Sequence, residues 1–223
     1  MKRIPLALRH LPDYTHGEEA MNTVTHIVGA AMAILALILG ICKTVQKQDP
    51  LGIVSAVIYG VSMLSVYTVS SVYHGMPSGT GKKVMQVLDH CTIYFLIAGS
   101  YTPIALSALL PVYPGIAWRL LLFQWGLTAV AVTLTAIDLR KYRVFSMLCY
   151  IGMGWAVLPF LAQTRAVLTG TGFTFLLAGG IAYTLGAILY GIGSKKRWFH
   201  SVFHIFVVLG SALQMVAILK YAL

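Results

Sequence analysis

Continuous apolar stretches separated by short polar connections dominate the pattern of this 223-residue chain. Each stretch is about 20 residues long, the length at which an α-helix crosses the hydrocarbon core of a bilayer. Membrane strands would alternate apolar and polar positions instead, so the pattern predicts helices. Seven membrane spans are expected, at residues 22–41, 52–73, 84–109, 118–137, 144–161, 172–192 and 199–219. Pro103 lies inside the third span, where a kink or an early helix end is expected.

The composition supports a membrane protein. Hydrophobic residues make up 58% of the chain and charged residues 10%, whereas soluble domains carry about 25% charged residues. The connections are too short to fold independently. The predicted fold is therefore an all-α, integral membrane bundle of seven transmembrane helices, with a cytoplasmic N-terminal segment at 1–20 and one transmembrane domain at 21–223.

A formal net charge of +10 raises the question of nucleic acid, but the basic residues lie in loops rather than along one helix face. No nucleic-acid partner is expected. Loop placement is instead the positive-inside signal, which predicts a multi-pass protein of the plasma or inner membrane with its N-terminus in the cytoplasm and its C-terminus outside. Eleven of the 16 basic residues fall on the predicted cytoplasmic side: Lys2, Arg3, Arg9, Lys82, Lys83, Arg140, Lys141, Arg143, Lys195, Lys196 and Arg197.

Histidines collect at one level of this predicted bundle. His200 and His204 stand four residues apart at the start of the last span, so they share one helix face. His74 ends the second span, and Asp89 opens the third. The loop between these two spans is short, which makes them antiparallel neighbours and lets His74 and Asp89 approach each other.

These residue types fit a catalytic zinc site, in which three protein ligands leave a fourth position for water. His74, His200 and His204 would supply three nitrogens. Asp89 would orient the water and accept its proton, and Ser70, one turn before His74, would hydrogen-bond a developing oxyanion or a bound polar group.

Structural roles remain open for each residue, and a histidine pair spaced like His200 and His204 also occurs as hydrogen-bonded core or interfacial residues. Asp89 is also explained as a charge favoured at a helix N-terminus, Ser70 as a residue bonded to its own helix backbone, and His74 as an interfacial side chain. For His26 and His90, a helix-to-helix hydrogen bond is at least as good an explanation as metal ligation.

Four ordered motifs resemble those of the bacterial hemolysin III proteins, which are grouped with the progestin and adipoQ receptors, including the adiponectin receptors, and more distantly with the alkaline ceramidases. The motifs are EEAMNTVTHIVG at 18–29, SSVYH at 70–74, LDHCTIYFLIAGSYTP at 88–103 and HSVFHIFVVLGS at 200–211. The resemblance implies a zinc site near the cytoplasmic face, with His74, His200 and His204 as ligands, Asp89 holding the water, and Ser70 nearby.

Three functions follow as hypotheses. The first is a zinc-dependent intramembrane hydrolase, similar to a ceramidase, that cleaves an amide or ester bond in a lipid. The second is a non-catalytic sensor of membrane lipids or fluidity, or a receptor-like protein, in which zinc only ties helices together. The third is a channel or cytolysin, for which the sequence offers no recognisable selectivity filter or charged ring. Membrane lipids are the expected partners in each case.

Overall fold

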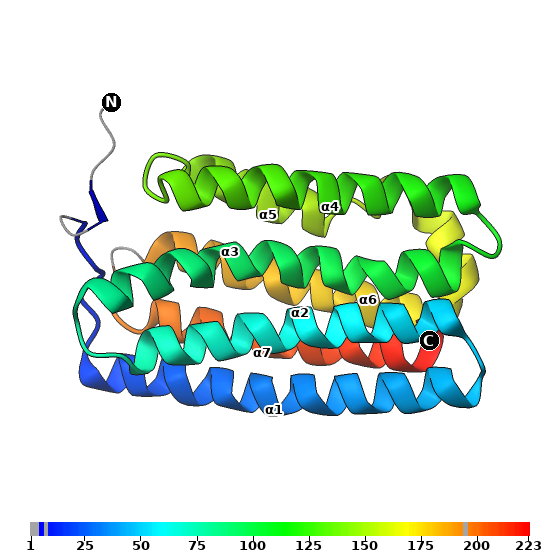
Figure 1. The fold of residues 1–223 in the computed structure, drawn as a ribbon, viewed down its shortest axis with the longest axis horizontal. Helices are drawn as coiled ribbons and strands as arrows, with labels where there is room; N and C mark the ends of the chain where they lie inside the picture. Colours follow the sequence, from blue (N-terminus) through cyan, green and yellow to red (C-terminus); the bar gives the residue numbers. More distant parts are fainter. Residues whose placement is uncertain (1–4, 7–8, 194–195) are drawn as a thin grey trace.

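A computed structural model describes residues 5–6, 9–193 and 196–223 (Figure 1). Lys2, Arg3 and Lys195, three of the basic residues behind the predicted orientation, lie outside the described residues. The regular elements of the described chain are all helical, which confirms the all-α prediction. They are α1 (His16–Gln46), α2 (Pro50–Gly75), α3 (Thr80–Pro103), η2 (Ile104–Leu109), α4 (Pro114–Ile137), α5 (Arg143–Gly154), η3 (Leu158–Phe160), α6 (Leu161–Gly193), α7 (Phe199–Ala217) and η4 (Ile218–Ala222).

The long helices lie side by side along the longest axis of the molecule, and the start of α1 and the C-terminus lie toward opposite ends of that axis (Figure 1). α1 packs against α2 and α7, and α6 packs against α7. α2 and α3 run antiparallel and pack together, as the short connection between them predicts. The beginnings of α1, α3 and α7 and the end of α2 therefore share one end of the bundle.

The first helix begins at His16, six residues before the predicted start of the span. Thr15 and Glu18 form a capping box, in which Thr15 Oγ1 accepts from Glu18 N at 3.3 Å and Glu18 Oε2 accepts from Thr15 N at 2.9 Å. This arrangement satisfies donors that a helix start leaves unpaired. The polar stretch before the apolar run is thus helical, and it places Glu19 and Asn22 on the same helix as the membrane-facing residues.

Pro103 ends α3, and the π-helical segment η2 continues directly from it. This confirms the early helix end predicted at that position. Wider turns at such a point accommodate the backbone hydrogen bond that proline cannot make.

The predicted fifth span at 144–161 is not one continuous helix. α5 ends at Gly154 after 12 residues, and the short 3₁₀ turn η3 follows before α6. The described chain contains six helical segments long and apolar enough to cross a membrane, and the fifth of these runs from 143 to 192 through α5, η3 and α6. The physical reason is Pro159, which cannot occupy a helix interior without removing a hydrogen bond.

Neighbouring helices satisfy the backbone at this interruption. The Tyr101 hydroxyl of α3 donates to Gly154 O at 2.8 Å and accepts from Val157 N at 3.1 Å. Gln124 of α4 donates to Met153 O at 2.8 Å. Non-helical backbone is tolerated in a membrane only where protein groups replace the missing water, and these side chains supply that replacement.

Candidate metal centre

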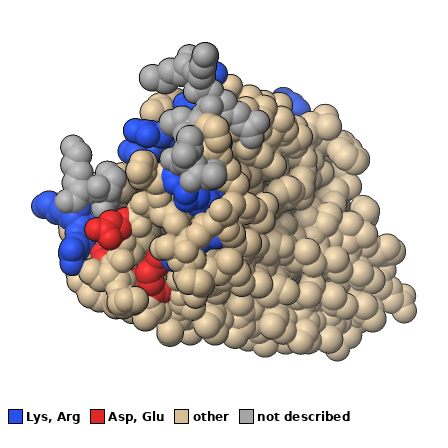
Figure 2. Space-filling view, turned by 60° about the vertical axis from the view of Figure 1, so that its left-hand side comes forward, with Lys and Arg blue, Asp and Glu red and all other residues tan. Residues whose placement is uncertain are grey.

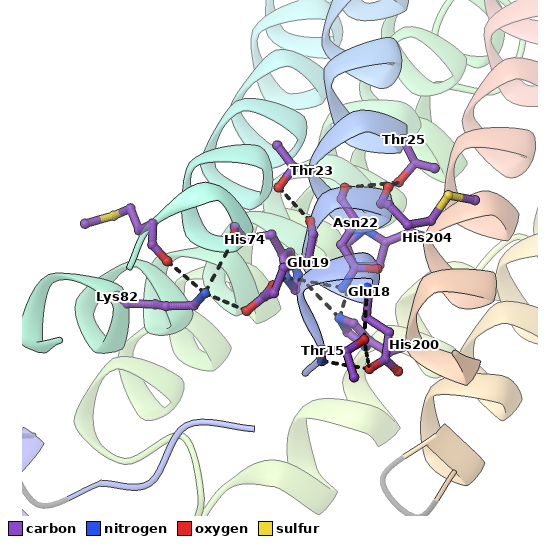
Figure 3. A network of polar contacts seen from close by, with 12 residues as sticks. Thr15, Glu18, Glu19, Asn22, Thr23, Thr25, His74, Lys82, His200 and His204 are labelled. Carbon is purple, nitrogen blue, oxygen red and sulfur yellow. Dashed lines mark hydrogen bonds and ion pairs between the residues drawn. The ribbon is translucent and has the colours of Figure 1, made fainter. Parts of the chain in front are cut away.

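Three imidazoles from two helices converge at the end of the bundle where α1 begins (Figure 3). His74 comes from the last turn of α2, and His200 and His204 come from the first two turns of α7. The Nε2 atoms of His200 and His74 are 3.4 Å apart, and those of His204 and His200 are 3.0 Å apart. One nitrogen from each of the three rings lies within 4.8 Å of the other two.

This spacing fits a tetrahedral metal ion. Ligand nitrogens at about 2.0–2.1 Å from zinc stand about 3.3 Å from one another in a tetrahedron. The two Nε2 separations bracket that value. His74 and His204 are almost fully buried, with 2% and 1% of their surfaces exposed, so these nitrogens have little access to bulk water as an alternative partner.

Glu19 fixes the orientation of His74. Its Oε2 atom lies 2.5 Å from His74 Nδ1, so the carboxylate accepts the Nδ1 proton and leaves the Nε2 lone pair directed at the other two histidines. The Asn22 amide nitrogen also approaches Nδ1, at 3.3 Å. A carboxylate on the distal nitrogen of a ligating histidine is the usual outer partner in zinc sites.

Lys82 holds Glu19 in turn. Its Nζ atom donates to Glu19 Oε1 at 2.6 Å and to Met76 O at 2.9 Å. The Lys82 side chain is nearly buried, with 6% of the residue exposed, and a buried ammonium needs such partners. Neither Glu19 nor Lys82 was predicted from the sequence to belong to this site. The available signal was the spacing of Glu19, Asn22 and His26, which places three polar groups on one face of an otherwise apolar helix.

Replacing Glu19 by glutamine tests this contact. We expect Glu19→Gln to bind zinc about 10- to 100-fold more weakly, because the neutral amide no longer enforces the His74 tautomer. The measurement is competition for zinc between purified protein and a chromophoric chelator.

Asp49→Asn is the matched control for Glu19→Gln. Asp49 caps α2 at the opposite end of the bundle, and its carboxylate accepts from Gly52 N. Asparagine caps helices as well as aspartate does, so this variant should keep the wild-type zinc affinity. Unchanged affinity in Glu19→Gln would contradict the orienting role.

Glu18 attaches the start of α7 to the start of α1. Its Oε1 atom accepts from Trp198 N at 2.6 Å, and Trp198 adopts a left-handed backbone conformation with φ 67° immediately before α7. Such a conformation is costly for a residue other than glycine. The Glu18 contact supports it and thereby sets the position of His200 two residues later.

Aromatic rings pack on both histidines of α7. The Tyr14 ring stacks on His200 with centroids 4.9 Å apart, and the His26 ring stacks on His204 with centroids 3.8 Å apart. Burial raises the pKa of the Tyr14 hydroxyl, so this ring packs as the neutral phenol. His26 is 4% exposed, and neither of its ring nitrogens has a hydrogen-bond partner.

Asp89 and Ser70 lie beside the triad, whereas His90 does not join it. Both line the cavity that His200 and His204 also line, and the Asp89 carboxyl interacts electrostatically with His90, His74 and the Ser70 hydroxyl. His90 is turned toward other groups: its Nδ1 faces Gln86 O at 2.8 Å and its Nε2 faces the Tyr190 hydroxyl at 3.3 Å. His90 therefore makes a contact between α3 and α6.

A cavity of about 720 Å³ opens beside this cluster. His200, His204, Asp89 and Ser70 all line it, together with His26. Ligand pockets in proteins typically have volumes of about 300–1,000 Å³ and mostly apolar walls with a few polar groups. The cavity has the size of such a pocket and brings the histidine cluster into contact with its contents.

A family model described as Haemolysin-III related matches residues 14–215, nearly the whole chain, including His74, His200, His204 and Asp89. The chain belongs to the haemolysin III family. This confirms the resemblance inferred from the four motifs. The matched region includes the start of α1 and the histidine pair of α7.

Individual haemolysin III relatives cover almost the same length. The chain is 37% identical to Hemolysin-3 of Bacillus cereus over 206 residues, which are 92% of this chain and 92% of the relative. It is 34% identical to the Hemolysin-3 homolog of Bacillus subtilis (strain 168) over 208 residues, 93% of this chain and 96% of the relative. The monocyte to macrophage differentiation factor of Homo sapiens is 29% identical over 228 residues, covering 98% and 90% of the two chains.

Proposed function

We propose that this haemolysin III protein is a zinc-dependent hydrolase that cleaves an amide or ester bond in a membrane lipid. One observation carries the proposal: three imidazole nitrogens converge, and two of these histidines, His200 and His204, line a largely apolar cavity that a carboxylate also lines. Metal ligands buried only for stability need no such opening, whereas a catalytic site requires an accessible fourth position.

Zinc is the metal that this donor set fits best. Neutral imidazoles suit zinc among the divalent ions, and three of them leave one position open. The contact between Glu19 and His74 supplies the outer partner that such sites use. A zinc ion bound there would provide Lewis acidity and would make water a nucleophile near neutral pH.

The side chains of this chain then have separate tasks. Asp89 is placed to orient a water molecule and accept its proton. Ser70 donates to the Asp89 carboxyl or to a polar group of the substrate. The apolar walls receive the lipid chain and exclude bulk water from the reacting bond.

The proposal includes the membrane topology. α5 and η3 together would complete a seventh crossing, with the segment 1–20 in the cytoplasm, one transmembrane domain at 21–223 and the C-terminus outside. Figure 2 supports this orientation, because Lys and Arg side chains gather at one end of the molecule while most of the remaining visible surface is uncharged. Such a bias at one membrane face marks the cytoplasmic side, and the plasma or inner membrane is the proposed location.

A non-catalytic role is the second candidate. It is favoured by the fact that the candidate metal ligands come from two different helices. His74 belongs to α2 and His200 to α7, two helices that each pack on α1. A metal ion bound by both would tie the bundle together at one end. In a lipid or fluidity sensor built this way, removing the metal lowers thermal stability without changing any reaction.

Zinc-dependent turnover separates the two candidates. Purified protein in lipid nanodiscs is incubated with a panel of lipid amides and esters, and released fatty acid is measured by mass spectrometry. We expect release from at least one lipid class, its loss on treatment with a chelator, and its return on adding zinc. A panel without zinc-dependent release, in protein that chelation destabilises, would contradict the hydrolase and support the sensor.

A further inference from the structure

The mouth of the cavity is lined by arginines. Arg140 lies in the short connection between α4 and α5, and Arg143 is the first residue of α5. Both are exposed at the surface and contribute to the cavity wall. Arg9, from the segment before α1, also lines the mouth and donates to Ile137 O at 3.3 Å. Three arginines from two parts of the chain thus line the cavity, and the exposed pair, Arg140 and Arg143, marks its solvent-facing end.

The carboxylates at this end do not neutralise the two arginines of the connection. Among the described residues, the ion pairs are those of Glu19 with His74 and Lys82. Asp138 lines the same mouth, but its Oδ1 atom accepts from Arg140 N and Lys141 N, both at 3.1 Å. These are backbone contacts that close the turn, so the guanidinium groups of Arg140 and Arg143 remain available to a ligand.

The cavity wall connects Arg143 with the histidine cluster. Arg143 and Tyr190 both line the cavity, as does His200. The Tyr190 ring contacts His200, with centroids 5.7 Å apart. Arg143, Tyr190 and His200 thus line one cavity, and a ligand held by Arg143 in that cavity can extend past Tyr190 toward the histidines.

Beyond the histidines the cavity wall is mostly apolar, although Ser100, Tyr183 and Thr184 also line it. Its walls there include Leu96, Ile97 and Val207, and they extend to Gln214. Gln214 follows His204 by ten residues of α7, about 15 Å along a helix at 1.5 Å per residue. The same cavity thus has a cationic entrance, the histidine cluster behind it, and an apolar interior long enough for part of an acyl chain.

We propose that the cavity binds a lipid with an anionic phosphate headgroup, which Arg140 and Arg143 hold while the acyl chain lies along the apolar walls beyond His204. This deepens the proposed function by naming the substrate class, and as an enzyme specificity it rests on that function. Guanidinium groups bind phosphate through paired, charge-assisted hydrogen bonds. The order of the chemistry along the cavity matches the order of headgroup, scissile bond and chain in such a lipid.

General attraction of loop arginines to an anionic membrane surface is the competing explanation. Lys141 distinguishes the two. It lies between the two arginines in the same turn and is exposed, but it does not belong to the cavity wall. Surface attraction would depend on Lys141 as much as on its neighbours, whereas recognition inside the cavity would not.

Binding is measured on purified protein in neutral detergent after zinc removal, so that no turnover occurs. The probes are oleoyl lysophosphatidic acid, monoolein with the same acyl chain and no charge, and inorganic phosphate. We expect the phosphate lipid to bind at least about tenfold more tightly than monoolein, as charge-assisted hydrogen bonds from two arginines predict. Inorganic phosphate alone should bind weakly, because it does not occupy the apolar walls.

Variants of Arg140, Lys141 and Arg143 test where the phosphate headgroup binds. Arg140→Gln combined with Arg143→Gln should remove the preference for the phosphate lipid while monoolein binding is retained, which also shows that the protein is folded. Lys141→Gln should keep the preference, and the double replacement by lysine should reduce it only in part. Equal affinity for the two lipids, an equal effect of Lys141→Gln, or competition by inorganic phosphate at the same concentration as the lipid would overturn the proposal.

The binding experiment tests the phosphate-lipid site separately from the proposed hydrolase activity. A preference for the phosphate lipid that depends on the two arginines, in a protein that hydrolyses no lipid, would leave the binding site standing and remove the enzyme. Hydrolysis of neutral lipids without preferential binding of the phosphate lipid would support the enzyme and remove the phosphate-lipid site.

Discussion

Replacing any one of His74, His200 and His204 by alanine should reduce zinc from one equivalent per chain to a trace. Each ring supplies one of three converging nitrogens, and two remaining ligands hold zinc far more weakly than three. We expect a loss of affinity of at least about 100-fold, since removing only an outer partner of a ligand already costs about 10- to 100-fold. Elemental analysis of the purified variants measures the bound metal.

Thermal unfolding gives a second readout for the same variants. A ligand that binds only the folded state stabilises it by about 2.7 kcal/mol at 100 times its dissociation constant. Added zinc should therefore raise the melting temperature of the wild-type protein and leave that of the alanine variants unchanged. His90→Ala is the control, because His90 lines the same cavity but faces Gln86 and Tyr190. Full zinc content in His74→Ala would show that the cluster is not a metal site.

Asp89→Asn should lower the rate of lipid hydrolysis by at least about 100-fold while zinc content stays at the wild-type value. The amide has nearly the same size and still forms hydrogen bonds, but it cannot accept a proton from water. General base catalysis contributes about 10²- to 10⁴-fold, which sets the expected loss. The measurements are fatty acid release under saturating lipid and elemental analysis of the same preparation.

Asp138→Asn is the matched control for Asp89→Asn. Both carboxylates line the cavity, but Asp138 is committed to the turn between α4 and α5, and its replacement should leave turnover close to that of the wild type. Loss of zinc in Asp89→Asn would make this residue a ligand, and full turnover would remove it from the mechanism.

The sequence predicted the helical membrane fold because lipid permits few alternatives to an apolar helix of about 20 residues. It also indicated the histidine cluster, since residues four apart share a helix face and a short loop forces two helices together. The fifth span shows the limit of that reasoning. The run is mostly apolar, but Pro159 interrupts the helix, and Tyr101 and Gln124 satisfy the backbone groups freed there.

The partners of the histidines were harder to predict than the histidines themselves. Glu19 contacts His74 and Lys82, which lie 55 and 63 positions further along the chain. Glu18 contacts Trp198, 180 positions away. Such contacts depend on how α1, α2, α3 and α7 are packed, and no periodicity within one helix specifies them. The shape of the cavity also depends on helix packing, because its walls come from segments throughout the chain.

By itself the sequence determined the kind of fold, the family and the residues able to bind a metal, because hydropathy, helical spacing and short connections are local properties. Only the tertiary structure decided that three imidazole nitrogens meet, that Glu19 sets the His74 tautomer, and that one cavity joins the arginines to the apolar interior. These features require atoms from distant parts of the chain to lie within a few ångströms of one another, and helix packing alone fixes such distances.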